Sequence, residues 1–255
     1  TQATLRSHSA TLRSGHLTRV MCNWATGRKT DILIKPLKFN YYMEHCELSS
    51  HEMYSKLIKV FPELEDWTQK DITEIKKFLK KNSVVLEIGC SWGRVIRALA
   101  PYCKKFVGID NSSIEIEEAK SFLKDVPNVD LYLEDGKKTH FQNEFFDIII
   151  IVGNTFGNLG ENKELVLQEM KRILKKDGKI LLSVYSQGAK AKRLKAYKDI
   201  GMKIKTTKNK KIVFGGGLIS EEFSKAELKS IFEKFGLKVQ FIDLCKIAVL
   251  CIISK

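Results

Sequence analysis

A short run, Val85–Gly93 (VLEIGCSWG), places an acidic side chain and two glycines directly after an apolar stretch. Glycine lets the backbone turn sharply and approach a ligand closely, and the start of a following helix offers free N–H groups. The carboxylate of Glu87 suits a cationic ligand better than a pyrophosphate. Asp110 ends the next apolar run, where a carboxylate can accept both ribose hydroxyls of a nucleoside. The pattern predicts a site for a cationic nucleoside; a merely structural strand-to-helix turn is the alternative.

Two further candidate segments follow later apolar runs. Asp135-Gly136 comes after the third of these runs and Val152–Leu159 (VGNTFGNL) after the fourth. In open parallel sheets, ligands bind at the carboxyl ends of the strands, so both segments are expected at the same edge as the glycine run. Each also has a structural explanation, because Asp-Gly is a common turn pair and Asn154 and Asn158 can form turns.

Several aromatic residues are candidates for an acceptor site. Tyr41, Tyr42 and His45 precede the first predicted helix, Phe156 lies in the segment after the fourth strand, and Tyr185 follows the fifth. Ring faces attract cations, and the pKa of a histidine suits a base. The two N-terminal tyrosines serve equally well as lid packing and His45 as a surface residue, so no catalytic base is assigned.

The elements that must position these residues alternate regularly. Apolar runs ending in glycine or aspartate alternate with amphipathic segments, which is typical of a doubly wound, mostly parallel α/β sheet. A helix is expected over 165–176, ended by Asp177-Gly178, and capping boxes at Ser112/Glu115 and Ser224/Glu227. The last two strands are too close in sequence for a crossover helix, so they are expected to pair antiparallel. The predicted strands are 83–88, 106–109, 129–133, 145–152, 179–184, 237–242 and 247–253.

Both ends of this alternating region carry additional segments. A helix is expected over 47–65, ended or kinked by Pro62, and a second begins at Thr68 with Asp71 as a capping-box variant. Residues 186–220 are Lys-rich and are expected to form an insertion near the substrate site. We therefore divide the chain into a leader (1–30), an N-terminal helical lid (31–67) and one domain (68–255).

The leader differs in composition from the rest of the chain. It contains Arg6, Arg13, Arg19 and Arg28 and no acidic residue. Arg-rich, Ser-rich and acid-poor composition is typical of a transit peptide, and it fits an appended, disordered leader equally well. We expect little fold-determining information before about residue 31.

Composition excludes several classes of protein. The 255 residues are 44% hydrophobic and 29% charged, as in ordinary globular enzymes. There is no apolar run long enough for a membrane-spanning helix. The six cysteines show neither a CxxC pair nor zinc spacing, so we expect no metal, no disulfide and a cytoplasmic location. The net charge of +14 comes from lysines spread along the chain, which makes nucleic-acid binding possible but not favoured.

With these residues in view, the chain resembles the class I S-adenosylmethionine-dependent methyltransferases. The nucleotide loop of that family is usually written E/D-x-G-x-G-x-G. Glu87, Gly89 and Gly93 match it, and Ser91 stands where the middle glycine is usual. The resemblance covers roughly 68–255, and the dinucleotide pattern G-x-G-x-x-G is absent. It implies S-adenosylmethionine as cofactor and a Rossmann-like, seven-stranded, mostly parallel sheet with an antiparallel last strand.

The resemblance also assigns roles to residues. It implies that Glu87 lies near the methionyl amino group, that Asp110 holds the ribose and that Asp135-Gly136 meets the adenine amino group. The segment GNTFGNL is similar to the G-N-S-F segment of glycine N-methyltransferase and related small-molecule enzymes. The cofactor-binding residues implied are Glu87, Gly89, Cys90, Ser91, Trp92, Gly93, Asp110, Asn111, Asp135, Gly136 and Asn154.

Two functional hypotheses remain open for the acceptor. The first is methyl transfer to a nitrogen or oxygen of a small molecule, for which the protein supplies mostly orientation and exclusion of water. The second is an RNA or protein methyltransferase in which the lysines of 186–220 form a docking surface. A cofactor-binding scaffold without activity and a nicotinamide dehydrogenase are weaker rivals. The lysines concerned are Lys190, Lys192, Lys195, Lys198, Lys203, Lys205, Lys208, Lys210 and Lys211.

Overall fold

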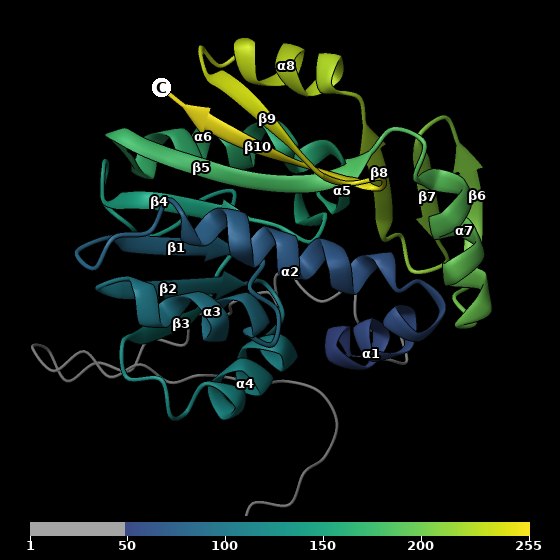
Figure 1. Ribbon diagram of the computed structural model, residues 1–255, viewed down its shortest axis with the longest axis horizontal. Helices are drawn as coiled ribbons and strands as arrows, with labels where there is room; N and C mark the ends of the chain where they lie inside the picture. The colour runs from purple at the N-terminus through teal and green to yellow at the C-terminus, as the bar shows by residue number, and fades with distance from the viewer. Residues whose placement is uncertain (1–48) are drawn as a thin grey trace, which may run out of the picture. The chain divides into compact units, whose positions relative to one another are not determined.

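The computed structural model describes residues 49–255 and shows one extended sheet between two layers of helices (Figure 1). Its main part has the strand order β3-β2-β1-β4-β5-β10-β9. The first five strands are parallel, and β10 is antiparallel to both of its neighbours, as predicted. These strands are β1 (Val84–Ile88), β2 (Lys105–Asp110), β3 (Val129–Leu133), β4 (Phe146–Ile151), β5 (Leu174–Ser186), β9 (Lys238–Cys245) and β10 (Ala248–Ser254).

Apolar faces of the helices cover both sides of this sheet. Ile75 of α2, Ile96 of α3 and Ala119 of α4 are buried in one core, and Met170 of α6 and Phe232 of α8 in the other. A doubly wound sheet requires such a core on each face. The helices are α1 (Ser50–Val60), α2 (Glu63–Lys76), α3 (Arg94–Leu99), α4 (Ser113–Phe122), α5 (Thr155–Asn158), α6 (Lys163–Ile173), α7 (Lys190–Asp199) and α8 (Lys225–Glu233), with single 3₁₀ turns at Ala100–Tyr102 and Gly160–Asn162.

The second helix begins earlier than the sequence indicated. Instead of starting at Thr68, α2 starts at Glu63, directly after Pro62. The φ of −62° at Pro62 already suits a helix, and the acidic first turn is favourable at the positive end of the helix dipole. Thr68 is buried within the helix, where its hydroxyl donates to the Leu64 carbonyl at 2.9 Å. Neither Thr68 nor Asp71 is therefore a capping residue.

The boundary between α6 and β5 also differs from the one that the sequence predicts. The helix ends at Ile173 rather than 176, and β5 starts at Leu174 rather than 179. Leu174 pairs with Phe146 of β4 and is fully buried. Long-range pairing and burial here override the helical periodicity of the local sequence.

The two predicted capping boxes behave differently. Ser224 and Glu227 form both reciprocal bonds at the start of α8, as expected. At α4, the Ser112 hydroxyl accepts from the Glu115 N–H, but the Glu115 carboxylate does not return the bond. That carboxylate binds elsewhere, next to the glycine run.

Residues 186–220 form α7, two strands and the start of a third. The strands β6 (Ile204–Lys208), β7 (Lys211–Phe214) and β8 (Ile219–Phe223) pair antiparallel in sequence order. β8 also runs parallel to the last two residues of β5, Tyr185 and Ser186. Within the part of the chain that the structure describes, the sheet therefore has ten strands rather than seven. The additional strands and α7 stand at one end of the sheet, on the right in Figure 1.

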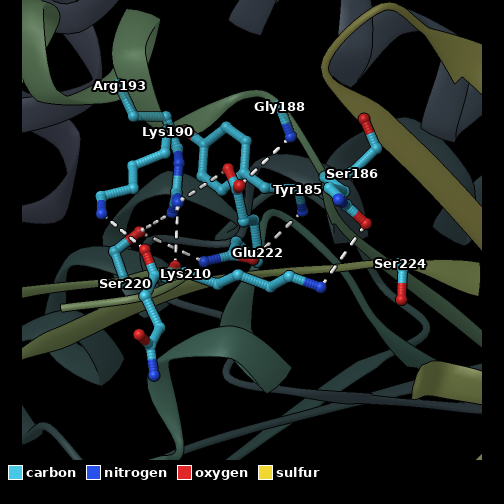
Figure 2. Close-up of polar contacts among 12 residues, drawn as sticks. Tyr185, Ser186, Gly188, Lys190, Arg193, Lys210, Ser220, Glu222 and Ser224 are labelled. Carbon is cyan, nitrogen blue, oxygen red and sulfur yellow. Dashed lines mark hydrogen bonds and ion pairs between the residues drawn. The ribbon is translucent and has the colours of Figure 1, made fainter.

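A buried ion pair joins α7 to the additional strands. Arg193 is 0% exposed, and its guanidinium donates to Glu222 Oε2 at 3.2 Å and to Ser220 Oγ at 2.8 Å. Its Cζ lies 4.5 Å from the centroid of the Tyr185 ring. Figure 2 shows this guanidinium between Ser220 and Glu222, beside that ring. Since Tyr185 ends β5, the contacts of Arg193 tie the additional part to the main sheet.

Loss of this ion pair should destabilise the fold strongly. We expect Arg193→Met to lower the free energy of unfolding by about 3–5 kcal/mol, because Glu222 stays buried without its cation. Lys195→Met is the matched control on the same helix, since its pair with Asp199 is largely exposed and is worth at most about 1 kcal/mol. Urea unfolding of both variants measures the difference. Similar small losses in both would contradict the structural role of Arg193.

Candidate functional site

A cavity of about 220 Å³ lies at the carboxyl ends of β1, β4 and β5. Its walls come from the loop after β1, the loop after β4, helices α1 and α2, and the additional part formed by α7 and β6 to β8. Parallel strands bring their carboxyl ends to one edge of a sheet, which is why these loops meet. The sequence-predicted residues that line the cavity are Glu87, Gly89, Cys90, Ser91, Trp92, Asn154 and Tyr185.

The loop after β1 needs glycine at two positions. Gly89 has φ +72°, and a Cβ there would lie 2.5 Å from Thr155 Cγ2. Gly93 has φ +88°, and its Cβ would lie 2.6 Å from Leu123 Cδ1. Both positions combine a left-handed backbone with a close approach that only glycine permits. The loop therefore folds back over the end of β1 and exposes its backbone to the cavity.

Ser91, the departure from the family pattern, connects this loop to the first helix. It also has a left-handed backbone, φ +50°, which costs a non-glycine residue about 1–2 kcal/mol. Its hydroxyl donates to Glu115 Oε2 at 2.7 Å, and Glu115 Oε1 accepts the Ser50 N–H at 3.0 Å. Glu115 thus bridges the loop and the first turn of α1, which offsets part of the strain.

Asp110 supports the same loop from β2. Its two carboxylate oxygens accept the N–H groups of Ser91 and Ser112, each at 2.9 Å. Burial raises the pKa of Asp110, and the two N–H bonds oppose that rise. Hydrogen bonds to both oxygens fix the orientation of the carboxylate at the end of β2.

The remaining residues implied for the cofactor follow β1 to β3 but do not line the cavity. Gly93 caps α3 and Asn111 is exposed. Asp135 pairs with Lys137 at 2.9 Å, and Gly136 packs so closely on β1 that a Cβ would lie 2.8 Å from Ile88. The strand order β3-β2-β1 places all of them along one edge of the sheet, beside the cavity.

The acceptor-site candidates separate into three groups. Tyr185 is buried and lines the cavity. Phe156 does not; it is 0% exposed and packs against Phe223 and Phe232 in the opposite core, because α5 turns its ring away from the cavity. Tyr41, Tyr42 and His45 lie outside the residues that the structure describes.

Asn154 lines the cavity, and its side chain forms hydrogen bonds between the elements of the cavity wall. It has φ +69° and is buried, and its Oδ1 accepts the Tyr185 N–H at 3.2 Å. Its Nδ2 donates to Ser220 Oγ at 3.4 Å. The side chain therefore joins the loop after β4 to β5 and β8.

Two buried carboxyl groups face the cavity. Glu87 and Asp71 are each 3% exposed and line the cavity, and Glu87 Oε2 and Asp71 Oδ1 have no hydrogen-bond partner among residues 49–255. Burial raises the pKa of Glu87 well above its usual range, with the nearby carboxylates adding to the rise, and it raises the pKa of Asp71 to about 7. Arg94 opposes both shifts. Unpartnered buried carboxyls are costly unless a cation compensates them.

The sequence interpretation missed Asp71 and Glu115. The local sequence predicts Asp71 as a capping residue of a helix that begins at Thr68, and Glu115 as half of a capping box. Each belongs to a helix far along the chain from its partner, so no local pattern identifies it. Polar residues at positions where the helix period requires apolar ones were the available signal.

Within residues 49–255 no cluster of His, Cys, Asp and Glu has the arrangement needed to hold a metal ion. In the same part of the chain, no helix combines the length and the apolar character needed to cross a bilayer.

Comparison with known proteins identifies the domain that carries this site. A family model described as a methyltransferase domain matches residues 85–178, which contain the glycine run, Asp110 and Asp135. Residues 85–178 are therefore a methyltransferase domain. An uncharacterized protein of Methanocaldococcus jannaschii, MJ1123, is 30% identical over 149 residues, which are 55% of this methyltransferase and 67% of the relative. The uncharacterized methyltransferase YcgJ of Bacillus subtilis is 31% identical over 102 residues, 38% of this chain and 39% of the relative.

The fold is shared with solved methyltransferases. A structure of an S-adenosylmethionine-dependent methyltransferase from Clostridium acetobutylicum superimposes with a TM-score of 0.60 at 13% identity, covering 80% of this chain and 96% of that one. This similarity supports the Rossmann-like architecture. The sequence resemblance implies S-adenosylmethionine as the cofactor of this domain.

The residues present fit that cofactor. S-adenosylmethionine carries an ammonium and a sulfonium, and Glu87 offers a buried carboxylate oxygen that has no partner in the described chain. The loop from Gly89 to Gly93 leaves room for close approach, because side chains are absent at two of its positions. The donor set is therefore complementary to a cationic nucleoside.

Removing the Asp71 charge should stabilise the cofactor-free methyltransferase at high pH. The pKa of Asp71 lies near 3.8 when unfolded and about 7 when folded, so its ionisation opposes folding increasingly as pH rises from about 4 to 7. Below both pKa values the carboxyl is neutral in the folded and the unfolded state, so its ionisation does not lower the free energy of unfolding. We expect Asp71→Asn to be more stable than wild type by about 1–4 kcal/mol at pH 8, with the difference vanishing near pH 4.

Urea unfolding at pH 4, 6 and 8 measures this trend. Asp66→Asn is the matched control, since Asp66 lies on the exposed side of the same helix and pairs with Lys70. The charged groups near Asp71 are Glu87 of β1 and Arg94 of α3, and neither variant alters them. A less stable Asp71→Asn protein at pH 8 would contradict the uncompensated charge.

Proposed function

We propose that this methyltransferase transfers the methyl group of S-adenosylmethionine to a nitrogen or oxygen atom of a small molecule. The observation that carries the proposal is the shape of the cavity: it extends from the glycine run to walls contributed by α1, α2 and the additional strands. An acceptor that reaches the cofactor must fit among several ring systems. These are Tyr54, Trp67, Trp92, Tyr185, Tyr197 and Phe214.

In this proposal the cofactor lies along the edge formed by β1 to β3. Glu87 holds the methionyl ammonium, and the backbone of the glycine run passes alongside the cofactor. Asp110 accepts hydrogen bonds from the ribose, for which each carboxylate oxygen keeps a further lone pair beside its N–H bond. Asn111 and Asp135-Gly136, at the ends of β2 and β3, border the adenine.

In this reaction the protein forms no covalent bond to the acceptor or the cofactor. The bound cofactor supplies an activated methyl group, and transfer is an in-line displacement at that carbon. The side chains of this chain orient the acceptor, exclude water and, where the acceptor carries a proton, remove it. Ring faces such as those of Trp67 and Tyr185, 4.8 Å apart between centroids, suit the neighbourhood of a sulfonium.

Docking of RNA or protein on the lysines of 186–220 has less support. Four of these lysines form ion pairs with acidic residues, which reduces the positive potential of the surface. Lys190 donates to the Asn209 carbonyl. The ion pairs are Lys192–Glu63, Lys195–Asp199, Lys210–Glu227 and Lys211–Glu221.

Calorimetric binding tests the cofactor assignment first. We expect the wild type to bind S-adenosylmethionine and S-adenosylhomocysteine but not NADH. Asp110→Asn should bind the first two ligands at least tenfold more weakly, because an amide keeps only one of the two acceptor oxygens of the carboxylate. Asp125→Asn is the control, because Asp125 is exposed and pairs with Arg97 on α3. NADH binding, or unaltered affinity in Asp110→Asn, would refute the assigned site.

A transfer assay then distinguishes the acceptor classes. Radiolabelled methyl from the cofactor should reach members of a small-molecule panel of amines and alcohols. Transfer only to bulk RNA, with affinity falling steeply as salt rises, would replace the small-molecule proposal with the RNA one.

A further inference from the structure

The cavity holds one more carboxylate than the cofactor requires. The ammonium of the cofactor accounts for Glu87 in the proposed function. Asp71, on α2, is equally buried and lines the same cavity, yet its Oδ1 has no partner within residues 49–255. A second buried carboxyl with an unpartnered oxygen calls for a second cationic group.

Hydrogen bonding at Ser183 fixes which oxygen of Asp71 is available. Ser183, on β5, accepts the Trp67 indole N–H and the Gly153 backbone N–H through Oγ, both at 3.3 Å. Both partners are donors only, so the single hydroxyl proton of Ser183 must point to Asp71 Oδ2, 2.8 Å away. Asp71 is therefore held as an acceptor at Oδ2, which leaves Oδ1 for a ligand.

The surroundings of Asp71 suit an organic cation. The rings of Trp67 and Tyr185 meet edge to face at 4.8 Å between centroids, and both line the cavity. Arg94, which also lines the cavity, already contacts Tyr54: its Cζ lies 4.2 Å from the ring centroid and its Nη1 donates to the hydroxyl at 3.3 Å. Ring faces attract cations, so a carboxylate beside them suits a bound ammonium.

We propose that Asp71 binds the ammonium group of an amine acceptor through Oδ1 and takes its proton, so that the atom methylated is an amine nitrogen. This inference rests on the proposed small-molecule function and narrows its acceptor to amines. It also assigns a base, which the sequence did not identify.

The proton and electron balance is complete. The ammonium R–NH₃⁺ gives one proton to the Asp71 carboxylate, which becomes a neutral carboxyl, and the nitrogen regains its lone pair. That lone pair forms the N–CH₃ bond while the C–S bond of the cofactor breaks and its electrons return to sulfur. The products are R–NH₂⁺–CH₃ and S-adenosylhomocysteine, and Asp71 later releases its proton to solvent.

The acidity of Asp71 is suited to this exchange. Burial raises its pKa to about 7, and the Ser183 hydroxyl, Arg94 and the Trp67 indole oppose the rise. A base works best when its pKa lies near the working pH. Above that value Asp71 is a carboxylate that can bind the ammonium; below it, the neutral carboxyl loses this attraction.

The test is calorimetric titration of amine and alcohol pairs into protein saturated with S-adenosylhomocysteine. The probes are benzylamine with benzyl alcohol and 2-phenylethylamine with 2-phenylethanol, which differ only in the polar group. For wild type at pH 8 we expect each amine to bind at least tenfold more tightly than its alcohol. Asp71→Asn should abolish that preference, and Asp66→Asn, on the exposed side of α2, should keep it.

A pH series adds a readout that a merely structural role would not change. Amine affinity of the wild type should fall as pH decreases through about 7, whereas alcohol affinity should stay constant in both proteins. In transfer assays with S-adenosylmethionine, the methylated product should come from the amines.

The outcomes separate this inference from the proposed function. Normal binding of S-adenosylhomocysteine with equal affinity for amine and alcohol, or with an amine preference that survives Asp71→Asn, overturns the role of Asp71 and leaves the methyltransferase assignment intact. Failure of every variant to bind S-adenosylhomocysteine overturns the proposed function and this inference with it.

Discussion

The pairing of β8 with the end of β5 is the constraint on which the cavity depends. β5 continues past the last paired residue of β4, and Tyr185 and Ser186 then pair with Glu222 and Phe223 of β8. This short parallel contact makes the additional strands continuous with the main sheet. The outer wall of the cavity is therefore fixed to the same strand that carries Ser183.

Arg193 holds this junction together, although burial of its guanidinium carries a large desolvation penalty. A fully buried guanidinium is tolerated only when it is paired, and Glu222 and Ser220 supply its partners. Its Nε nevertheless has no partner among the described residues. Arg193 also lies over the Tyr185 ring, so it links α7 to β8 and to the end of β5 at once.

A second connection couples the cofactor loop to α1. Glu115 accepts hydrogen bonds from Ser91 in the loop and from Ser50 at the start of the helix. His51 of that helix also packs on Trp92, with ring centroids 4.5 Å apart. A glycine at position 91 would relax the backbone but would remove one end of this bridge. The departure from the family pattern therefore has a structural consequence, because it places α1 over the loop.

The cavity is also charged in a way that opposes folding of the empty protein. Glu87 and Asp71 are both buried without full compensation, and among residues 49–255 Arg94 is the cation that lies near both. Sites of this kind trade stability for ligand binding. Binding of cations is then favourable partly because it relieves a cost already present in the fold.

Much of the fold could be predicted from the sequence by itself. Alternating apolar runs predicted the parallel sheet, since periodicity and strand burial are local properties. The glycine run was predictive because Gly89 and Gly93 adopt backbone angles that other residues avoid. The short link between β9 and β10 excluded a crossover, which determined their antiparallel pairing.

Only the tertiary structure decided the rest, because the decisive contacts join segments far apart in the chain. Local periodicity assigned Leu174 to a helix, and pairing with Phe146 placed it in β5. The strands within 186–220 have weak individual patterns, and their pairing with one another and with β5 establishes them. A hydrogen bond from Ser183, a residue of another element, orients Asp71 in the cavity. A side chain's local pattern determines its secondary structure, but its chemistry depends on which distant groups the fold brings beside it.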